Sequence, residues 1–354
     1  MIGTAGLSRL RGTEPVIATA TTTGGWPVML VSSLADGRGR PWAGAARAPS
    51  TRLALDQGTR TGRRQGCLTK DGPTERRGTP REASMAYANI LVSVDLDEAA
   101  TDRIRLAASL ARRFEATLTG AAACKVPAPD YVRDIGEVYD EDPHFEEKAR
   151  ALLAQAHALF ERSTEAPLRR DWREALAGPI SHLVEQARAA DLLVVGRRGS
   201  DDIPLGTLGV SPGPVLMEAA RPVLVVPPRV EHLRGARIVV AWKDGSEARR
   251  AVSAALPFIR EADQVFVVST GEGARNEGAE EVAGHLARHG AAVTTHLLRT
   301  VVSDGDELLR FAVKQQADLI VMGAYGHTRL REWLFGGVTY EMLHRSPLPC
   351  LMCH

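Results

Sequence analysis

The chain lacks the features that mark membrane proteins and disulfide-rich secreted proteins. No stretch of its 354 residues approaches the roughly 18 consecutive apolar residues that a membrane-spanning helix requires. Only four cysteines occur, too few for a disulfide framework in a chain of this length. The net charge is +1, and the hydrophobic fraction of 44% is typical of a globular protein. We therefore expect a cytoplasmic protein with no membrane partner.

The sequence also lacks the signatures of common enzymes. It contains no Walker lysine pattern and no Ser, His and Asp in the order of a catalytic triad. His285 and His289 are four residues apart and could share a helix face, but no third metal ligand accompanies them. We expect no catalytic residues and no metal-binding residues, with weak ATP hydrolysis as an open alternative.

Residues 1–84 differ from the rest of the chain. They contain 12 Arg and 1 Lys against 6 acidic residues, so this segment carries +7 and the remainder carries −6. With little periodic apolar surface, the segment cannot offset its ordering entropy, and disorder is expected. A basic nucleic-acid-binding arm, a transit peptide and a translation start placed too early all remain open. A translation start placed too early is favoured, because Met85 leads straight into the first predicted strand. We therefore expect no nucleic-acid partner.

The most informative feature is an internal repeat. The segment 190–199 is echoed 127 residues later by 317–326, and the same offset relates Gly209 to Gly336 and Pro222 to Pro349. Each copy contains an apolar strand, the spacing G-x2-G-x9-G, a helix and a closing strand. In α/β proteins, a strand that ends in glycine and leads to a helix is a common phosphate-binding arrangement. We call Gly196, Gly199 and Gly209 the first glycine loop, and Gly323, Gly326 and Gly336 the second.

Alternating apolar runs and amphipathic stretches predict a parallel, doubly wound α/β sheet in each repeat. The predicted domains are residues 85–228, the first repeat, and 235–354, the second repeat. In the first, strands are expected at 90–94, 116–121, 192–195 and 223–226, with helices at 95–113, 145–161 and 180–189. In the second, strands are expected at 238–242, 264–268, 292–298, 319–322 and 350–352, with helices at 247–259, 279–289 and 307–316.

The last residues, Cys350 to His354, spell C-x-x-C-H, the pattern of covalent haem attachment. In register with Val223–Val226 of the first repeat, however, this segment is the closing strand of the second repeat. Cys350 then stands where the first repeat has a core valine, and a free cysteine packs well as a small hydrophobe. We predict a packed strand, with redox sensing by Cys353 as the lesser alternative.

From about Tyr87 to its end, the chain resembles the universal stress protein family in its tandem two-domain form. The resemblance rests on the opening strand with Asp95, the Ala-Asp-Leu-Leu-Val-Val-Gly strand, the spaced glycines and the Arg-Pro-Val-Leu-Val-Val ending. It implies two Rossmann-like domains of the adenine nucleotide α-hydrolase-like type. It also implies that an aspartate after the first strand, the three glycines and a following hydroxyl contact ATP or a related nucleotide, with Mg as a possible companion.

The first repeat matches this pattern more closely than the second. Asp95, Gly196, Gly199 and Gly209 all match, while Val210 stands in place of the hydroxyl residue and Ser211 follows it.

In the second repeat Gly323, Gly326 and Gly336 match, but Gly337 replaces the hydroxyl residue. Trp242 and Lys243 stand where the family has an apolar residue and the aspartate. An alternative interpretation of all these glycines is that they shape tight turns and let a helix pack on a strand.

The resemblance implies a stress-response protein that binds a nucleotide, mainly through the first repeat, and acts on an unknown protein partner rather than by catalysis. The alternative is a nucleotide-independent scaffold or dimerisation protein with degenerate loops. The closing strands, Val223–Val226 and residues 350–352, are expected to pair and form an intramolecular pseudo-dimer. A homodimer through sheet edges is expected in addition.

Overall fold

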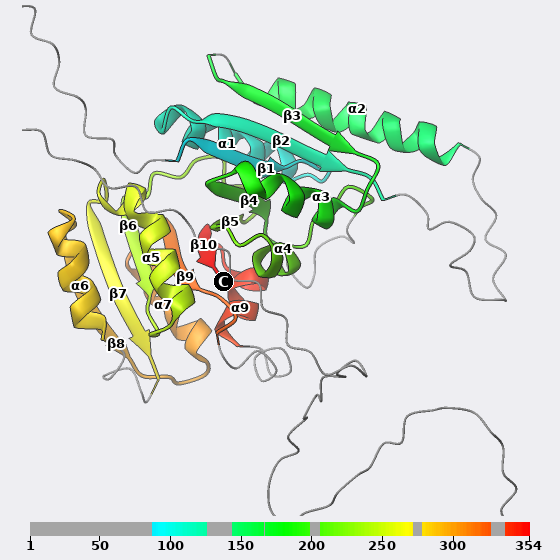
Figure 1. The fold of residues 1–354 in the computed structure, drawn as a ribbon. Coiled ribbons are helices and arrows are strands. Elements are labelled where there is room, and N and C mark those ends of the chain that lie inside the picture. The colour runs from blue at the N-terminus through cyan, green and yellow to red at the C-terminus, as the bar shows by residue number, and fades with distance from the viewer. Residues whose placement is uncertain (1–86, 126–143, 166, 199–205, 272–277, 327–336) are drawn as a thin grey trace, which may run out of the picture. The chain divides into compact units, whose positions relative to one another are not determined.

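A computed structural model describes residues 87–125, 144–165, 167–198, 206–271, 278–326 and 337–354 (Figure 1). The predicted N-terminal segment 1–84 therefore lies outside the described residues, as do Gly199 and Gly336.

The described strands form one ten-stranded sheet in the order β3-β2-β1-β4-β5-β10-β9-β6-β7-β8. The first five strands belong to the first repeat and the others to the second. The neighbours within each half are parallel, as the alternating pattern predicts. The strands are β1 (Asn89–Ser93), β2 (Thr117–Ala123), β3 (Arg170–Ala175), β4 (Leu192–Gly196), β5 (Val223–Val226), β6 (Arg237–Ala241), β7 (Gln264–Thr270), β8 (Val293–Leu298), β9 (Leu319–Gly323) and β10 (Cys350–Cys353).

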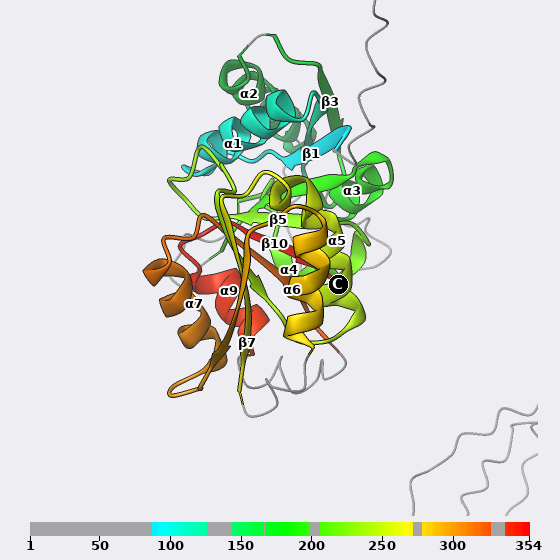
Figure 2. The same cartoon turned by 90° about the vertical axis from the view of Figure 1, so that its left-hand side faces the viewer.

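The two closing strands join the halves. β5 and β10 pair in antiparallel register, with Leu224 opposite Leu351 and Met352 opposite Val223. Figures 1 and 2 show the two strands side by side. The predicted pairing of the closing strands is therefore confirmed, and each strand covers an edge that would otherwise be open.

Helices cover both faces of each half of the sheet. In the first repeat, α1 and α2 pack on one core cluster, and α3 and α4 pack on the other. In the second repeat, α5 and α6 lie on one side of the strands, and α7 and α9 on the other (Figure 2). Strands buried on both faces read as continuous apolar runs, as β4, β5 and β9 do. The helices are α1 (Ala100–Arg113), α2 (Phe145–Ser163), α3 (Pro179–Gln186), α4 (Pro212–Glu218), α5 (Ser246–Ile259), α6 (Ala279–Arg288), α7 (Asp304–Lys314) and α9 (Val338–Arg345), with a short 3₁₀ turn at Ala187–Ala189.

Aromatic packing also connects the repeats. The rings of Tyr87 and Phe114 from the first repeat lie 5.1 Å apart, and Phe258 of α5 lies 5.8 Å from Tyr87 and 5.3 Å from Phe114. The Tyr87 hydroxyl donates a hydrogen bond of 2.6 Å to the carbonyl oxygen of Ala254. The repeats therefore share side-chain packing as well as a sheet.

Two details differ from the sequence-based expectation. The first helix begins at Ala100 rather than at Asp95, so Asp95 lies in the loop after β1. The strand β3 was not predicted. Its residues Arg170–Ala175 are mostly charged and partly exposed, because β3 is an edge strand and pairs only with β2 among the described strands. Such a strand carries no apolar run to reveal it.

Candidate functional site

The predicted site residues of the first repeat lie where β1 and β4 end. These neighbouring parallel strands lead to α1 and α4 on opposite faces of the sheet. In open α/β sheets, the usual ligand site lies at the carboxyl ends of the strands where the strand order switches in this way. Asp95 follows β1, Gly196 ends β4, and Gly209 and Ser211 precede α4.

Asp95 is held by an arginine that the sequence-based analysis overlooked. Arg103 of α1 is only 2% exposed, and its Nη2 lies 2.8 Å from Asp95 Oδ1. Arg103 Nε also donates a hydrogen bond of 2.9 Å to the carbonyl oxygen of Ser93. Burial alone would raise the pKa of Asp95, but the charge and hydrogen bond of Arg103 outweigh it and lower that pKa below its ordinary value. Asp95 is therefore a fixed, ionised carboxylate.

The same arginine explains why residue 196 is a glycine. A Cβ atom placed on Gly196 would lie 2.5 Å from Arg103 Nη1, so a larger residue would displace the buried guanidinium. One sequence signal could have revealed Arg103. It lies four residues before Ala107, on the apolar face of α1, where a solvated arginine is not expected.

Two residues at the carboxyl ends of β1 and β4 carry a buried polar atom without a hydrogen-bond partner. Among the described residues, the buried side-chain atoms that lack a hydrogen-bond partner are Ser93 Oγ, His182 Nε2 and Arg197 Nε. Ser93 is the last residue of β1, and Arg197 directly follows Gly196 at the end of β4. Buried polar atoms usually have partners, so these two atoms have hydrogen-bonding capacity that the described residues leave unused. The Arg197 guanidinium also donates to the carbonyl oxygen of His344 in the second repeat.

Ser211 is the residue that the sequence offers as the phosphate-binding hydroxyl. It caps α4 without a side-chain hydrogen bond to the helix. Ser211 also borders a cavity of about 260 Å³ that lies between the repeats and is lined by Arg198 from the first repeat and by Tyr325, Thr339 and His344 from the second. The hydroxyl is thus not used by the helix that follows it.

In the second repeat, helix α5 packs directly on the glycine loop. A Cβ atom on Gly323 would lie 2.6 Å from the backbone nitrogen of Ala248, and one on Gly326 would lie 2.7 Å from Glu247 Oε1. Gly337 is the N-cap residue of α9. Thr339 lies two residues further on, and its Oγ1 accepts a hydrogen bond of 3.4 Å from the backbone nitrogen of Tyr325.

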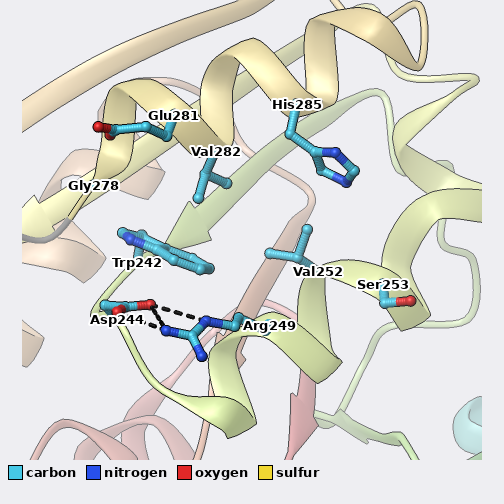
Figure 3. A pocket seen from close by; sticks show the side chains of 9 residues that line it. All are labelled: Trp242, Asp244, Arg249, Val252, Ser253, Gly278, Glu281, Val282 and His285. Atoms are coloured by element: carbon cyan, nitrogen blue, oxygen red, sulfur yellow. Dashed lines mark hydrogen bonds and ion pairs between the residues drawn. The ribbon is translucent and has the colours of Figure 1, made fainter.

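A cavity of about 450 Å³ lies in the second repeat, between α5 and α6 (Figure 3). Trp242, Val252 and Val282 line it with apolar surface, and the Asp244–Arg249 pair lies at one end. Arg249 donates to Asp244 Oδ1 and Oδ2, in both cases from Nη2 at 2.7 Å. Sequence-based reasoning noted the loss of the aspartate at position 243 but overlooked Asp244 one residue later.

Within the described ranges, no group of three or more His, Cys, Asp or Glu side chains is arranged to hold a metal ion. Nor does any helix in those ranges have the length and apolar character needed to cross a membrane.

The doubled sheet, with a glycine-containing loop after corresponding strands of each half, defines a tandem Rossmann-like α/β protein. A model of the universal stress protein family matches residues 86–227 and residues 236–354. These matches cover well over half of the sequence, so the chain belongs to the universal stress protein family.

Individual relatives agree with this assignment. A universal stress protein of Synechocystis is 23% identical over 170 residues, which are 46% of this chain and 57% of that relative. This chain therefore spans little more than half the length of that relative. A universal stress protein of Methanocaldococcus jannaschii is 28% identical over 137 residues, covering 32% of this chain and 79% of the relative.

The solved structure of a universal stress protein from Archaeoglobus fulgidus has a similar fold, with a TM-score of 0.56. The two chains are 18% identical, and the match covers 75% of this chain and 96% of the other. A universal stress protein solved in complex with cAMP also matches, at 27% identity over 40% of this chain and 97% of that one, with a TM-score of 0.28. The cAMP complex is a finding for that protein.

Proposed function

We propose that this universal stress protein binds an adenine nucleotide such as ATP in the first repeat, at the ends of β1 and β4. Asp95, Gly196, Gly209 and Ser211 would form the site, with Gly199 as the further glycine of the loop. The two repeats, residues 85–228 and 235–354, would act as domains of one cytoplasmic stress-response protein.

The observation that carries this proposal is the unused hydrogen-bonding capacity of Asp95 at the end of β1. Asp95 Oδ1 is bound to Arg103 and to the backbone nitrogen of Asp97, whereas no described residue donates a hydrogen bond to Oδ2. An ionised carboxylate oxygen is a strong acceptor for ribose hydroxyls. The unpaired Ser93 Oγ and Arg197 Nε lie at the same edge of the sheet. The end of β1 thus offers an acceptor, Asp95 Oδ2, to a ligand.

The action that follows is binding rather than turnover. No described residue near Asp95 forms a nucleophile–base pair of the kind that catalysis requires. We propose that nucleotide occupancy shifts the population of conformations around the first glycine loop, and so changes the surface offered to a protein partner. The proposal also includes an Mg ion bound together with ATP, a homodimer through sheet edges and a protein partner.

A second candidate function is a nucleotide-independent scaffold. The packing of Gly196 on Arg103 supports it, because that glycine has a structural role without any ligand. The β5–β10 pairing supports it as well, since it gives the duplicated fold a structural purpose.

Calorimetric titration of ATP into the full chain separates these candidates. We expect about one nucleotide per chain and a loss of about tenfold or more in affinity for Asp95→Asn, because the variant removes the charged acceptor. Ser211→Ala should weaken binding less, by the few-fold that one lost neutral hydrogen bond produces. Asp97→Asn is the matched control, because it removes an exposed carboxylate near the same arginine. Asp97 Oδ1 lies 4.0 Å from Arg103 Nη1.

Gly196→Val is unsuitable for this test, because it would disrupt Arg103 in either case. A wild-type chain that takes up no ATP at millimolar concentration would leave the scaffold function.

A further inference from the structure

A carboxylate of the protein itself lies against residues 323–326, the described part of the second glycine loop. Glu247, in the first turn of α5, directs its side chain at the glycines around it. A Cβ atom on Gly323 would lie 2.7 Å from Glu247 Cγ, and one on Gly326 would lie 2.7 Å from Oε1. A Cβ atom on Gly245 would also collide with this carboxylate. Glu247 therefore fills the space that side chains at positions 245, 323 and 326 would otherwise occupy.

The local contacts hold the carboxylate in this place. Ser246 Oγ lies 3.1 Å from Glu247 Oε2 and can donate a hydrogen bond to it. Glu247 is the acidic residue of the first turn of the 14-residue helix α5, where the helix dipole favours a negative charge. The side chain is half-buried, so solvent screens its charge only in part.

The space beside the first glycine of each loop is filled by different residues. Gly196 and Gly323 are related by the repeat offset of 127 residues. A Cβ atom on Gly196 would meet the Arg103 guanidinium, whereas one on Gly323 would meet Glu247 and the start of α5. The two loops are therefore similar in sequence but differ in the residues packed against their first glycine: Arg103, itself paired with Asp95, in the first repeat, and Glu247 with Ala248 in the second.

We propose that Glu247 is a specificity-determining residue that excludes phosphate from residues 323–326, at the start of the second glycine loop. The carboxylate takes the volume that phosphate oxygens would need near Gly326, and its negative charge repels them. The tandem protein then binds one nucleotide per chain rather than two. The class of ligand in this inference is taken from the proposed function. The inference assigns the difference in nucleotide binding between the repeats to one side chain.

The test follows each loop separately in the full, ¹⁵N-labelled chain. Backbone amide resonances of Gly323 and Gly326 report the second loop, and that of Gly196 reports the first. ATP and inorganic triphosphate are titrated into the wild type, Glu247→Ala and Glu247→Gln. Because Gly196 is read independently, failure of nucleotide binding in the first repeat is distinguishable from failure of the present inference.

We expect Glu247→Ala to bind both probes at the second loop about tenfold or more tightly than the wild type, which corresponds to about 1.4 kcal/mol. Glu247→Gln removes the charge but keeps the volume, so its affinity should lie between the two. Glu281→Ala is the matched control, because it removes an exposed carboxylate from the first turn of α6, away from Gly326. It should behave as the wild type does.

Equal affinity of the second loop in the wild type and both Glu247 variants would overturn the proposal, whether that affinity is high or undetectable. An equal gain in Glu281→Ala would overturn it too, because general charge rather than Glu247 would then explain the result.

Discussion

At the scale of single residues, two charged side chains decide the character of the two loops. Arg103 lies under Gly196 and holds Asp95, and Glu247 lies against Gly323 and Gly326. Each comes from the helix that follows the first strand of its repeat. The spaced glycines thus have a structural role as well as the proposed ligand-binding role, and variants of these glycines alone cannot separate the two.

The Arg103–Asp95 pair should be a large local contribution to stability. Arg103→Met leaves the Asp95 carboxylate buried without its partner, and loss of one member of a buried pair costs about 3–5 kcal/mol of unfolding free energy. Urea unfolding at neutral pH measures this loss. Arg105→Met is the control, because the exposed Arg105–Glu231 pair should contribute only about 0–1 kcal/mol.

The loss should also depend on pH in one direction. The folded-state pKa of Asp95 lies below its ordinary value of 3.8, so the stabilisation by the ion pair is complete above that value. It is lost as the pH falls through the lower, folded-state pKa. The gap between wild type and Arg103→Met should therefore narrow in acid. A gap that widens there, or one no larger than that of Arg105→Met, would contradict the assigned role.

At the scale of secondary-structure elements, the closing strands are the central feature. β10 lies between β5 and β9, and its cysteines Cys350 and Cys353 are buried. Burial raises the pKa of each thiol to about 12. The C-x-x-C-H pattern is therefore part of a packed central strand, as the register with the first repeat predicts, and not an exposed attachment segment.

These thiols should be unreactive in the folded protein. With a pKa of about 12 the thiolate, which is the reactive form, is scarcely populated near neutral pH, and burial also blocks access. We expect a disulfide reagent to label Cys350 and Cys353 only after denaturation in guanidinium. Mass spectrometry of the C-terminal peptide measures the labelling. Rapid labelling of Cys353 in the native state would instead support redox sensing.

At the scale of the whole molecule, the two repeats share a continuous sheet and an aromatic contact among Tyr87, Phe114 and Phe258. Strands β5 and β10 lie in its centre, whereas β3 and β8 form its two ends. Neither half is complete without the other, because separation would expose the buried edges of β5 and β10.

We therefore expect the repeats to unfold together. Trp172 reports the first repeat and Trp242 the second, so variants that retain only one of these tryptophans, with all others replaced by Phe, report each half by fluorescence. Their urea midpoints should coincide with each other and with the circular dichroism midpoint, as two-state unfolding requires. Two separated transitions would show that the β5–β10 pairing does not couple the halves.

The pairing of Val223–Val226 with the C-terminal strand was expected from the resemblance to the family. The repeated order of strands and helices and the parallel sheet are what the sequence by itself determined. These features follow from local patterns, because continuous apolar runs, helical periodicity and glycine spacing are properties of neighbouring residues. The edge strand β3 escaped detection because its exposed residues carry no such pattern.

Only the tertiary structure decided which charge lines each loop. Arg103 and Glu247 lie on helices, far in sequence from Gly196 and Gly326, and no local pattern relates them. Folding brings them together because α1 and α5 pack against strands of their own repeats, next to these glycines. The physical reason is that spacing along the chain specifies an element, whereas the electrostatics of a site depends on which elements pack against each other.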